Sequence, residues 1–138
     1  MPGRHRERLE RQRRGEQVYL WAWVEDEPVG HVLVQWPSAL AADAAELEDL
    51  GVDDPWRRRG IGTQLVERCE EEARERGFAR IALNVGVEND GARAFYTRLG
   101  YTEIEGQAPH RITWPHLDET GAIVEAEEWC TTFTKELR

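Results

Sequence analysis

The most informative part of the sequence is AELEDLGVDDPWRRRGIGTQLVERCEEEARERG, which covers residues 45–77. Its first residues include Leu47, Leu50 and Val52, an apolar spacing that we interpret as a strand. A turn at residues 53–55 and three arginines follow, and the next segment has apolar residues at the spacing of one buried helix face. This face comprises Ile61, Leu65, Val66, Cys69 and Ala73. The stretch therefore predicts a strand, a basic turn and a helix, in that order.

A basic, glycine-containing turn between a strand and a helix favours phosphate binding. The first helical N–H groups have no intrahelical partner and form the positive end of the helix dipole. Gly60 and Gly62 lack the Cβ atoms that would keep a diphosphate from this backbone. A P-loop is excluded because it needs Gly-Lys-Ser/Thr, and Lys135 is the only lysine. A dinucleotide-binding fingerprint needs a third glycine where Leu65 stands, so the remaining alternative is a glycine-bearing helix start with solvated arginines.

The composition predicts one domain with one hydrophobic core in 138 residues. We expect a cytoplasmic protein without a membrane partner, because no apolar run has transmembrane length and no signal-peptide pattern is present. The net charge of −9 argues against nucleic acid as a partner and mildly favours a cationic substrate. Residues 1–16 are predicted to be a basic, possibly helical N-terminal segment, ahead of a domain at residues 17–138. Cys69 and Cys130 are predicted to be buried thiols.

The rest of the chain alternates between strand and helix patterns, which predicts an α/β fold with a mixed sheet. Residues 80–85 should form a strand parallel to the one ending at Val52, because the helix between them requires a crossover connection. Asn89 and Asp90 are good N-cap residues for a second helix, which Gly100 ends. The other expected segments are strands at residues 17–25, 29–36, 101–105 and 129–137, with a turn at residues 26–28, an alanine-rich connection at residues 37–44 and a long turn-rich connection at residues 106–126.

Two motifs carry a resemblance to a known family. Residues 57–62 read RRRGIG, and residues 89–101 read NDGARAFYTRLGY. They resemble the signature Gln/Arg-x-x-Gly-x-Gly/Ala and the downstream pattern Asn-x-x-Ala-x-x-Phe-Tyr-x-x-Leu-Gly-Phe/Tyr of the GNAT superfamily of acyl-CoA-dependent N-acyltransferases. The resemblance implies a mixed, mostly antiparallel sheet with a splayed parallel strand pair and flanking helices. It also implies acetyl-CoA as a cosubstrate, with no metal.

The resemblance further implies how the coenzyme binds. In the family the pantetheine arm lies in the gap between the splayed strands, and the diphosphate rests on the glycine turn. One N–H group among residues 50–52 would polarise the thioester carbonyl, Asn89 would bond the pantetheine or phosphate region, and Arg98 would lie near the adenosine 3′-phosphate. The residues expected to bind the coenzyme are Leu50, Gly51, Val52, Arg57, Arg58, Arg59, Gly60, Ile61, Gly62, Thr63, Asn89, Ala92, Tyr96 and Arg98.

Transfer of an acyl group to an amine needs a base, an oxyanion site and an acid for the departing thiolate. The resemblance assigns the acid to Tyr96. It leaves the base open between Glu46, which lies six residues before Val52, and Glu48. The two share a face if the strand is regular, and a bulge near Asp49 or Leu50 would change this. The alternatives to a carboxylate are solvent or a group on the substrate.

No histidine is assigned a metal-binding role, and the resemblance implies that acceptor substrates enter close to His110 and His116. His31 is interpreted as an ordinary strand residue, and His110 and His116 lie on the late connection without metal-ligand partners. Relatives of the family can also carry a glutamate at the position of Asn84, which this chain lacks.

Family members usually have a strand and two helices ahead of the hairpin that begins here at Gln17. We therefore expect the first strand and one helix to be absent, and a homodimer to cover the exposed sheet edge. The sequence predicts an N-acetyltransferase that acts on a small or peptide amine by direct attack. The alternatives are an inactive acyl-CoA-binding sensor or partner subunit, and a structural role without ligand or activity.

Overall fold

A computed structural model of the chain describes residues 15–38, 40 and 43–137, so the expected N-terminal segment lies almost wholly outside the described residues. The structure divides into two compact units. One runs to Leu83 and includes the chain from Lys135 onward, and the other covers residues 84–134. The described residues form seven strands and two α-helices, with mostly antiparallel pairing and one parallel pair. The predicted α/β class with a mixed sheet is confirmed.

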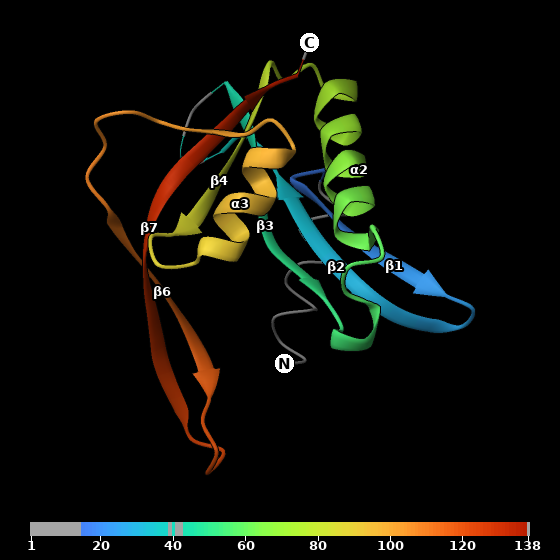
Figure 1. The fold of residues 1–138 in the computed structure, drawn as a ribbon, viewed down its shortest axis with the longest axis vertical. Coiled ribbons are helices and arrows are strands. Elements are labelled where there is room, and N and C mark those ends of the chain that lie inside the picture. Colours follow the sequence, from blue (N-terminus) through green and yellow to red (C-terminus); the bar gives the residue numbers. More distant parts are fainter. Residues whose placement is uncertain (1–14, 39, 41–42, 138) are drawn as a thin grey trace. The chain divides into compact units, whose positions relative to one another are not determined.

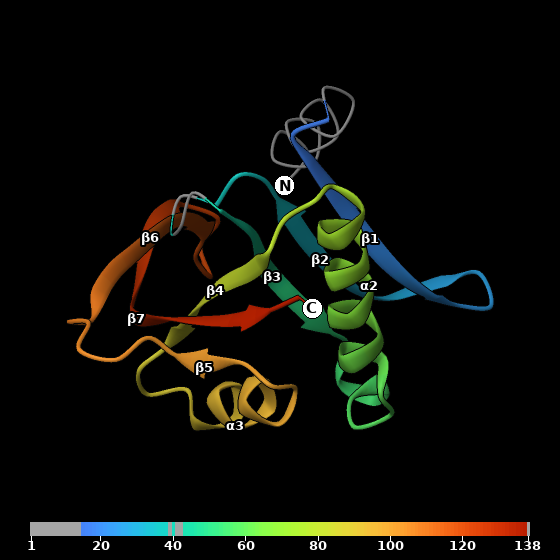
Figure 2. The ribbon, with the colours of Figure 1, turned by 90° about the horizontal axis from the view of Figure 1, so that it is seen from above.

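The first unit is built from an antiparallel sheet and one helix (Figures 1 and 2). Strands β1 (Gln17–Val24), β2 (Glu27–Gln35) and β3 (Ala44–Val52) pair in sequence order, and helix α2 (Ile61–Glu75) packs against them. The apolar face predicted for this helix is buried at Leu65, Val66, Cys69 and Ala73. No helix in the described part of the chain is long and apolar enough to cross a membrane.

The side of the sheet that faces α2 follows from a close approach at Gly30. A Cβ atom added to Gly30 would lie 3.2 Å from Leu65 Cδ1 and 3.4 Å from Ile61 Cγ2, so this residue faces the helix. Because side chains alternate along a strand, His31 faces the opposite side of the sheet. The start of α2 is thereby held against the middle of the sheet by direct backbone-to-side-chain packing.

The parallel pair is formed by β3 and β4 (Arg80–Gly86), as the crossover through α2 predicts. The paired residues are Ala44 with Arg80, Ala45 with Ile81 and Glu46 with Ala82. Only the first three of the nine residues of β3 are paired in this way, which fits the splayed strand pair expected from the resemblance.

The second unit contains helix α3 (Asp90–Arg98) and a long strand hairpin (Figure 1). Strand β7 (Ile123–Glu136) pairs antiparallel with β5 (Thr102–Glu103) and with β6 (His110–Leu117). The predicted start and end of α3 are confirmed to within one residue. This unit therefore carries the second sequence motif on a helix and the late hairpin on a continuous ladder.

Arg93 ties α3 to the strands of the second unit. Its guanidinium donates to Thr131 Oγ1 at 3.1 Å and to Glu103 Oε2 at 2.7 Å, and it lies 5.1 Å from the centre of the Phe133 ring. The hydrogen bond from Thr131, and next the one from Arg93, hold the pKa of the Glu103 carboxyl below its usual range. Helix α3 therefore lies against the face of β7 that carries Thr131 and Phe133.

The predicted connection at residues 106–126 is wrong, because β6 and the first part of β7 lie in it, and the last strand begins at Ile123 rather than at residue 129. This hairpin exposes large apolar residues, including Trp114 and Leu117, so its sequence lacks the alternation that marks a half-buried strand. Pro115 also suggested a break, although it lies within β6 opposite Glu125.

Two boundaries near the start of the chain also differ from the sequence prediction. The turn predicted at residues 26–28 is shorter, since β2 begins at Glu27 and Glu25 takes a left-handed φ of 56°. Strand β3 begins at Ala44, before the apolar residues that predicted it, because Ala44 and Ala45 are small and fully buried.

Candidate functional site

The turn between β3 and α2 has a well-defined backbone. Asp54–Trp56 form a short 3-10 helix, and Arg57 closes the turn by donating from Nε to the Val52 carbonyl at 2.9 Å. Arg58 and Gly60 have φ angles of 63° and 82°, in the left-handed region. Glycine adopts this conformation readily and arginine does so at a cost, so the turn holds a strained residue two positions before the N-cap of the helix.

The first turn of α2 presents open backbone donors. Its first hydrogen bond runs from Gln64 N to Gly60 O at 3.0 Å, so the N–H groups of Ile61, Gly62 and Thr63 precede the helical ladder. No side chain of the described residues caps this end, and no acidic residue lies in its first turn. Backbone donors and the positive helix dipole together make this end suitable for an anion.

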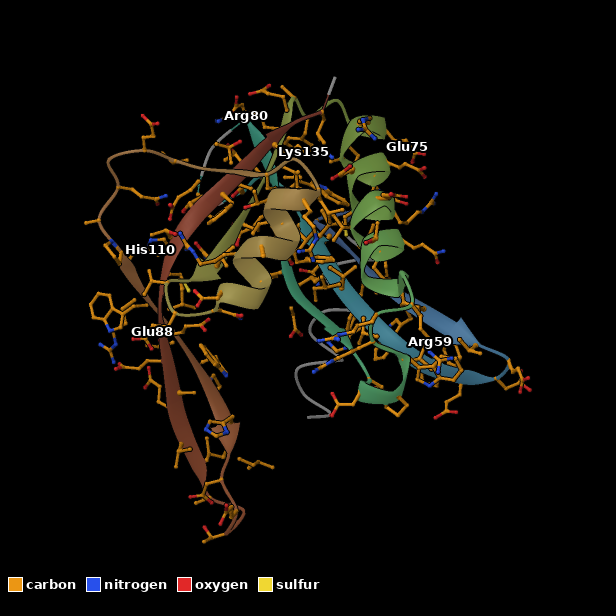
Figure 3. All side chains as sticks on the ribbon, in the orientation of Figure 1. Arg59, Glu75, Arg80, Glu88, His110 and Lys135 are labelled. Atoms are coloured by element: carbon orange, nitrogen blue, oxygen red, sulfur yellow. The ribbon has the colours of Figure 1, made fainter. Side chains whose placement is uncertain are left out.

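The three arginines of the turn differ in how they are held. Arg57 also pairs with Asp54 at 2.9 Å, and the guanidinium carbon of Arg59 lies 5.0 Å from the Trp56 ring centre. Figure 3 shows Arg59 near the N-terminal end of α2. Arg58 is exposed and makes no ion pair with any residue that the structure describes. Arg58 is therefore the arginine most available to an incoming anion.

Strand β3 contains the bulge that the sequence analysis considered as one possibility. It has one extra residue relative to β2 between Glu48 and Gly51, and Asp49 in this interval has a φ of 59°. Leu50, Gly51 and Val52, the residues expected to line the pantetheine, are half-buried and include or follow the irregular segment. A bulge turns backbone groups away from the regular ladder, which is what a strand needs to offer an N–H group to a ligand.

The two candidate bases, Glu46 and Glu48, precede this bulge and share one face of the sheet. Their partners on β2 lie on the same side as His31, opposite α2. Glu46 is only 6% exposed, and its Oε1 accepts a hydrogen bond from Ser38 Oγ at 2.9 Å. Glu48 is half-buried.

Tyr96, the expected acid, belongs to the second unit. It is buried on α3, with ring centres 5.0 Å from Phe95 and 5.6 Å from Tyr101. Aromatic neighbours on two sides restrict the orientation of the phenol ring. Such restriction is a requirement for a weak acid that must act by position.

The other expected ligands of the second unit lie at the two ends of α3. Asn89 is the N-cap, because its Oδ1 accepts a hydrogen bond from Ala92 N at 3.1 Å. Arg98 is exposed at the last turn. The side-chain oxygen of Asn89 therefore already has a partner. Its side-chain amide nitrogen has no partner among the described residues.

Both cysteines are buried and free, as predicted. Burial, and next the nearby Glu70 carboxylate, raises the pKa of Cys69 to about 12. Burial, and next the Glu128 carboxylate, raises the pKa of Cys130 to about 11. Both side chains therefore stay protonated at neutral pH, whereas nucleophilic attack requires a thiolate.

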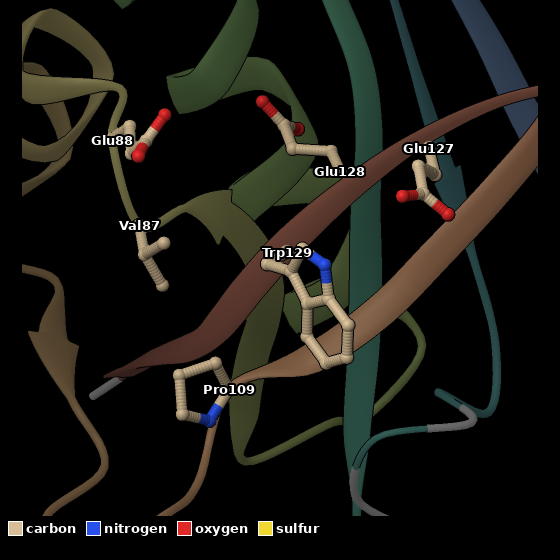
Figure 4. A pocket seen from close by; sticks show the side chains of 6 residues that line it. All are labelled: Val87, Glu88, Pro109, Glu127, Glu128 and Trp129. Atoms are coloured by element: carbon tan, nitrogen blue, oxygen red, sulfur yellow. The ribbon is translucent and has the colours of Figure 1, made fainter.

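Sequence reasoning assigned no role to a polar group that the structure brings together in the second unit. His110 Nε2 lies 2.7 Å from Asn84 Oδ1, and Thr132 Oγ1 lies 3.5 Å from the same oxygen. This group could have been found if residues 110–117 and 123–136 had been recognised as paired strands. Pro109 and Pro115 instead favoured a turn-rich connection. Beside it is a pocket lined by Val87, Glu88, Pro109, Glu127, Glu128 and Trp129 (Figure 4).

Comparison with known families bears directly on this geometry. The model of the acetyltransferase (GNAT) family matches residues 2–101 of the chain. The chain belongs to this family. Both motifs of the sequence analysis lie within the matched residues, which accounts for the glycine turn and the N-capped helix occurring together.

Relatives of this GNAT chain are named as N-acetyltransferases. An uncharacterized N-acetyltransferase of Methanocaldococcus jannaschii is 41% identical over 96 residues, which are 67% of this chain and 42% of that protein. A [ribosomal protein bS18]-alanine N-acetyltransferase of Escherichia coli is 38% identical over 64 residues, 46% of this chain and 43% of that protein. The matched segments cover less than half the length of these two relatives.

The fold is also similar to that of solved GNAT structures. The PaiA N-acetyltransferase of Thermoplasma acidophilum, solved in complex with coenzyme A, superposes with a TM-score of 0.71 at 15% identity. The superposition covers 94% of this chain and 67% of that one. At this identity the similarity establishes the fold.

Proposed function

We propose that this GNAT protein transfers an acetyl group from acetyl-CoA to a primary amine. One observation carries the proposal: α2 begins with three N–H groups outside its helical ladder, directly after an arginine-rich turn. Anions bind such helix ends through backbone donors and the helix dipole. In a member of an acetyltransferase family, the diphosphate of coenzyme A is the anion that this end suits.

In this proposal the coenzyme follows β3 into the turn. Leu50, Gly51 and Val52 line the pantetheine, and one of their N–H groups polarises the thioester carbonyl. The diphosphate is bound by the N–H groups of Ile61, Gly62 and Thr63, with Arg58 as the nearest uncommitted cation. Arg57 and Arg59 support the turn that Gly60 makes possible. Asn89, Ala92 and Arg98 are the proposed contacts from α3.

Acetyl transfer proceeds by direct attack of the amine on the thioester. An acetyl-cysteine intermediate would need a reactive thiolate, whereas the raised pKa of Cys69 and of Cys130 keeps both thiols protonated. A single attack also requires only one site for the oxyanion. The amine must arrive without its proton, and the departing thiolate must receive one.

Tyr96 is the proposed acid for the thiolate. A free phenol has a pKa of about 10, so it donates efficiently only when its oxygen is held within hydrogen-bond reach of the sulfur. The packing of its ring between Phe95 and Tyr101 supports such a fixed position. Glu46 and Glu48 are the carboxylates available as a base on the face of β3 opposite α2.

The acceptor is proposed to be a primary amine on a small molecule or peptide. The relative from Escherichia coli is named for acetylation of an alanine of a ribosomal protein, which is an amine of this class. The net charge of −9 favours cationic acceptors.

The test combines coenzyme binding with turnover. Acetyl-CoA is titrated calorimetrically, and release of free CoA is then followed with polyamines, aminoglycosides, amino acids and peptides. We expect binding, turnover with at least one amine, and loss of turnover without loss of binding in Tyr96→Phe. Tyr19→Phe, on the sheet of the first unit, is the control that should leave turnover unchanged.

Two outcomes would contradict the proposal at different points. Acetyl-CoA binding without turnover on any amine would favour an acyl-CoA-binding sensor or partner subunit. Absence of binding would contradict the role of the α2 terminus.

A homodimer is proposed separately. Strand β1 pairs only with β2 among the described residues, and Trp21 and Trp23 on it are 41% and 61% exposed. An outer strand with exposed tryptophans is a surface that a second subunit could cover. Sedimentation of the purified chain tests this, and a monomer at all concentrations would contradict it.

A further inference from the structure

His110 is held at a defined place on β4 by a single hydrogen bond. The residue opens β6 (Figure 3), and its Nε2 lies 2.7 Å from Asn84 Oδ1. Asn84 is the second residue of β4 after Ala82, the last one that pairs with β3. The histidine is therefore attached to β4 just beyond the point where the parallel pairing ends.

The partners of Asn84 identify the tautomer of this histidine. The Thr132 hydroxyl also donates to Asn84 Oδ1, at 3.5 Å. An amide oxygen only accepts hydrogen bonds, so Nε2 of His110 must carry the proton. In the neutral ring Nδ1 then has a free lone pair, and no described residue donates to it. A lone pair of this kind is what a general base requires.

The surroundings of His110 suit a cationic amine. In the β6–β7 register His110 stands opposite Cys130, and Glu128 lies two residues away on the same face of β7. A Cβ atom added to Gly86 would lie 2.7 Å from Glu128 Cδ, so this carboxyl group lies directly over β4. Asn84 and Gly86 are two residues apart, so they lie on the same face of β4 at a distance of about 7 Å. A carboxylate and the histidine thus share one side of the strand.

Glu128 also lines the pocket described above, together with Glu88 and Trp129 (Figure 4). Neither Glu88 nor Glu128 forms an ion pair with any residue in the described ranges. Pro109, directly before His110, forms part of the same wall. Carboxylates next to an indole ring attract organic ammonium groups by charge and by cation–π interaction. The lining of this pocket suits a cationic amine, and it includes the residue next to His110.

We propose that His110 is the group that takes the proton from the acceptor ammonium, and that Asn84 is a positioning residue that keeps Nδ1 of the ring unprotonated. The inference rests on the proposed acetyl transfer. It replaces Glu46 and Glu48 as the base, and it makes the pocket of Glu88, Glu128 and Trp129 the acceptor site.

The protons and bonds balance in this scheme. Nδ1 of His110 takes one proton from the ammonium, and the free amine forms a C–N bond with the thioester carbon. The C–S bond breaks, and the thiolate takes a proton from the Tyr96 phenol. A second proton leaves the nitrogen as the amide forms and restores the phenol. The proton on His110 passes to solvent, so one proton is released for each amide formed.

In water, free imidazole fits this step better than a free carboxylate. In water the ordinary pKa values are about 10.4 for a lysine-like ammonium, about 6.5 for imidazole and about 4.3 for a glutamate. In water, transfer of the proton from the ammonium to imidazole is therefore unfavourable by about four pKa units, and its transfer to a carboxylate by about six. The oxygen of Glu46 also already accepts a hydrogen bond from Ser38.

The first test uses an acceptor amine found with the wild-type protein. His110→Gln keeps a hydrogen-bond donor toward Asn84 and removes the base, so kcat/KM should fall about 100-fold or more while acetyl-CoA affinity is unchanged. In His110→Ala, added imidazole should restore part of the rate. His116→Gln, an exposed histidine on the same strand, is the matched control and should behave as the wild type.

The pH dependence separates catalysis from folding. The charged or titratable groups facing His110 are Glu128 and Cys130 on β7, and β4 contributes the neutral Asn84. The wild-type kcat/KM should rise with pH along a limb that His110→Gln loses, because only the neutral ring can take a proton. Loss of the limb in Glu46→Gln instead would overturn the inference, as would full activity of His110→Gln.

The positioning role has its own readout, which does not depend on activity. Ring ¹⁵N chemical shifts should show His110 protonated at Nε2 in the wild type and a mixture of tautomers in Asn84→Ala. An unchanged tautomer in that variant would contradict the role of Asn84. A wild-type protein that turns over no amine would contradict the proposed function and this inference together, whereas active His110 variants would contradict the inference alone.

Discussion

Helices α2 and α3 both follow a strand after a short turn, and their first turns differ in almost every respect. α3 is capped by the Asn89 side chain and has Asp90 in its first turn. α2 starts after Gly60, without a side-chain cap from the described residues and without an acidic residue in its first turn. One helix thus satisfies and neutralises its own N-terminus, while the other leaves these groups to solvent or to a ligand.

The open end of α2 does not result from a lack of capping residue types in this chain. The same chain supplies a good cap at Asn89, so suitable residue types were available to it. The N-cap of α2 is Gly60, which costs only about a few tenths of a kcal/mol relative to an asparagine or aspartate cap. Arg58 adds backbone strain close to this end of the helix, which fits the proposed use of the exposed donors by a ligand.

The largest expected effect comes from making α2 resemble α3. Thr63→Asp places a carboxylate in the first turn, where it competes for the N–H groups and repels a diphosphate. Acetyl-CoA affinity should fall about 100-fold, which corresponds to about 2.7 kcal/mol, in a calorimetric titration. The free energy of unfolding should rise by about 0.5 kcal/mol, since the charge favours the helix dipole.

Thr63→Asn controls for the shape of the new side chain without its charge. Its affinity for acetyl-CoA should remain within about tenfold of the wild type, or about 1.4 kcal/mol. Equal losses in the two variants would mean that shape rather than charge governs binding, and the two helix ends would then not differ in the way described.

A smaller effect is expected from making α3 resemble α2. Asn89→Ala removes the cap that Ala92 N uses, so the free energy of unfolding in urea should fall by about 1 kcal/mol. Asn89→Asp keeps an oxygen acceptor and should keep the stability. If both variants are equally destabilised, the side chain acts through something other than capping. If both also lose acetyl-CoA affinity, the Asn89 amide nitrogen is a coenzyme ligand as well.

The smallest effect concerns how α3 is held. Thr131 and Arg93 lower the pKa of Glu103 in the folded chain, so this carboxylate stabilises the fold above the ordinary glutamate pKa. The contribution should be lost as the pH falls from that value through the lowered one. In thermal unfolding, the difference between wild type and Glu103→Gln should therefore be present at about pH 7 and shrink toward about pH 3. A difference that is independent of pH would contradict the ionic role of Glu103.

The sequence predicted the regions around both helices well and the late hairpin poorly. Leu65, Val66, Cys69 and Ala73 repeat with helical spacing because one side of α2 is buried against the sheet. The bulge at Asp49 could be anticipated only as an option, since nothing in the local pattern fixes the register of β3 against β2. β6 and β7 were hidden because Trp114 and Leu117 remain exposed, so no buried face leaves a period in the sequence.

In the candidate site, too, the sequence predicted some residues well and others poorly. The glycine turn and Tyr96 lie in short motifs whose spacing is visible in the sequence. His110 and Asn84 are 26 residues apart and meet only through hydrogen bonding between side chains on β6 and β4. No local pattern encodes such a pair. The N–H groups of α2, in turn, are backbone groups that any residue could supply, so only the structure shows them uncapped.

The central claim is that the first N–H groups of α2 bind the diphosphate of coenzyme A. The most direct test is an amide NMR titration of the ¹⁵N-labelled chain with coenzyme A. The signals of Ile61, Gly62 and Thr63 should shift strongly at saturation, and their hydrogen exchange should slow. Saturable binding of coenzyme A that leaves these three signals unchanged would contradict the account.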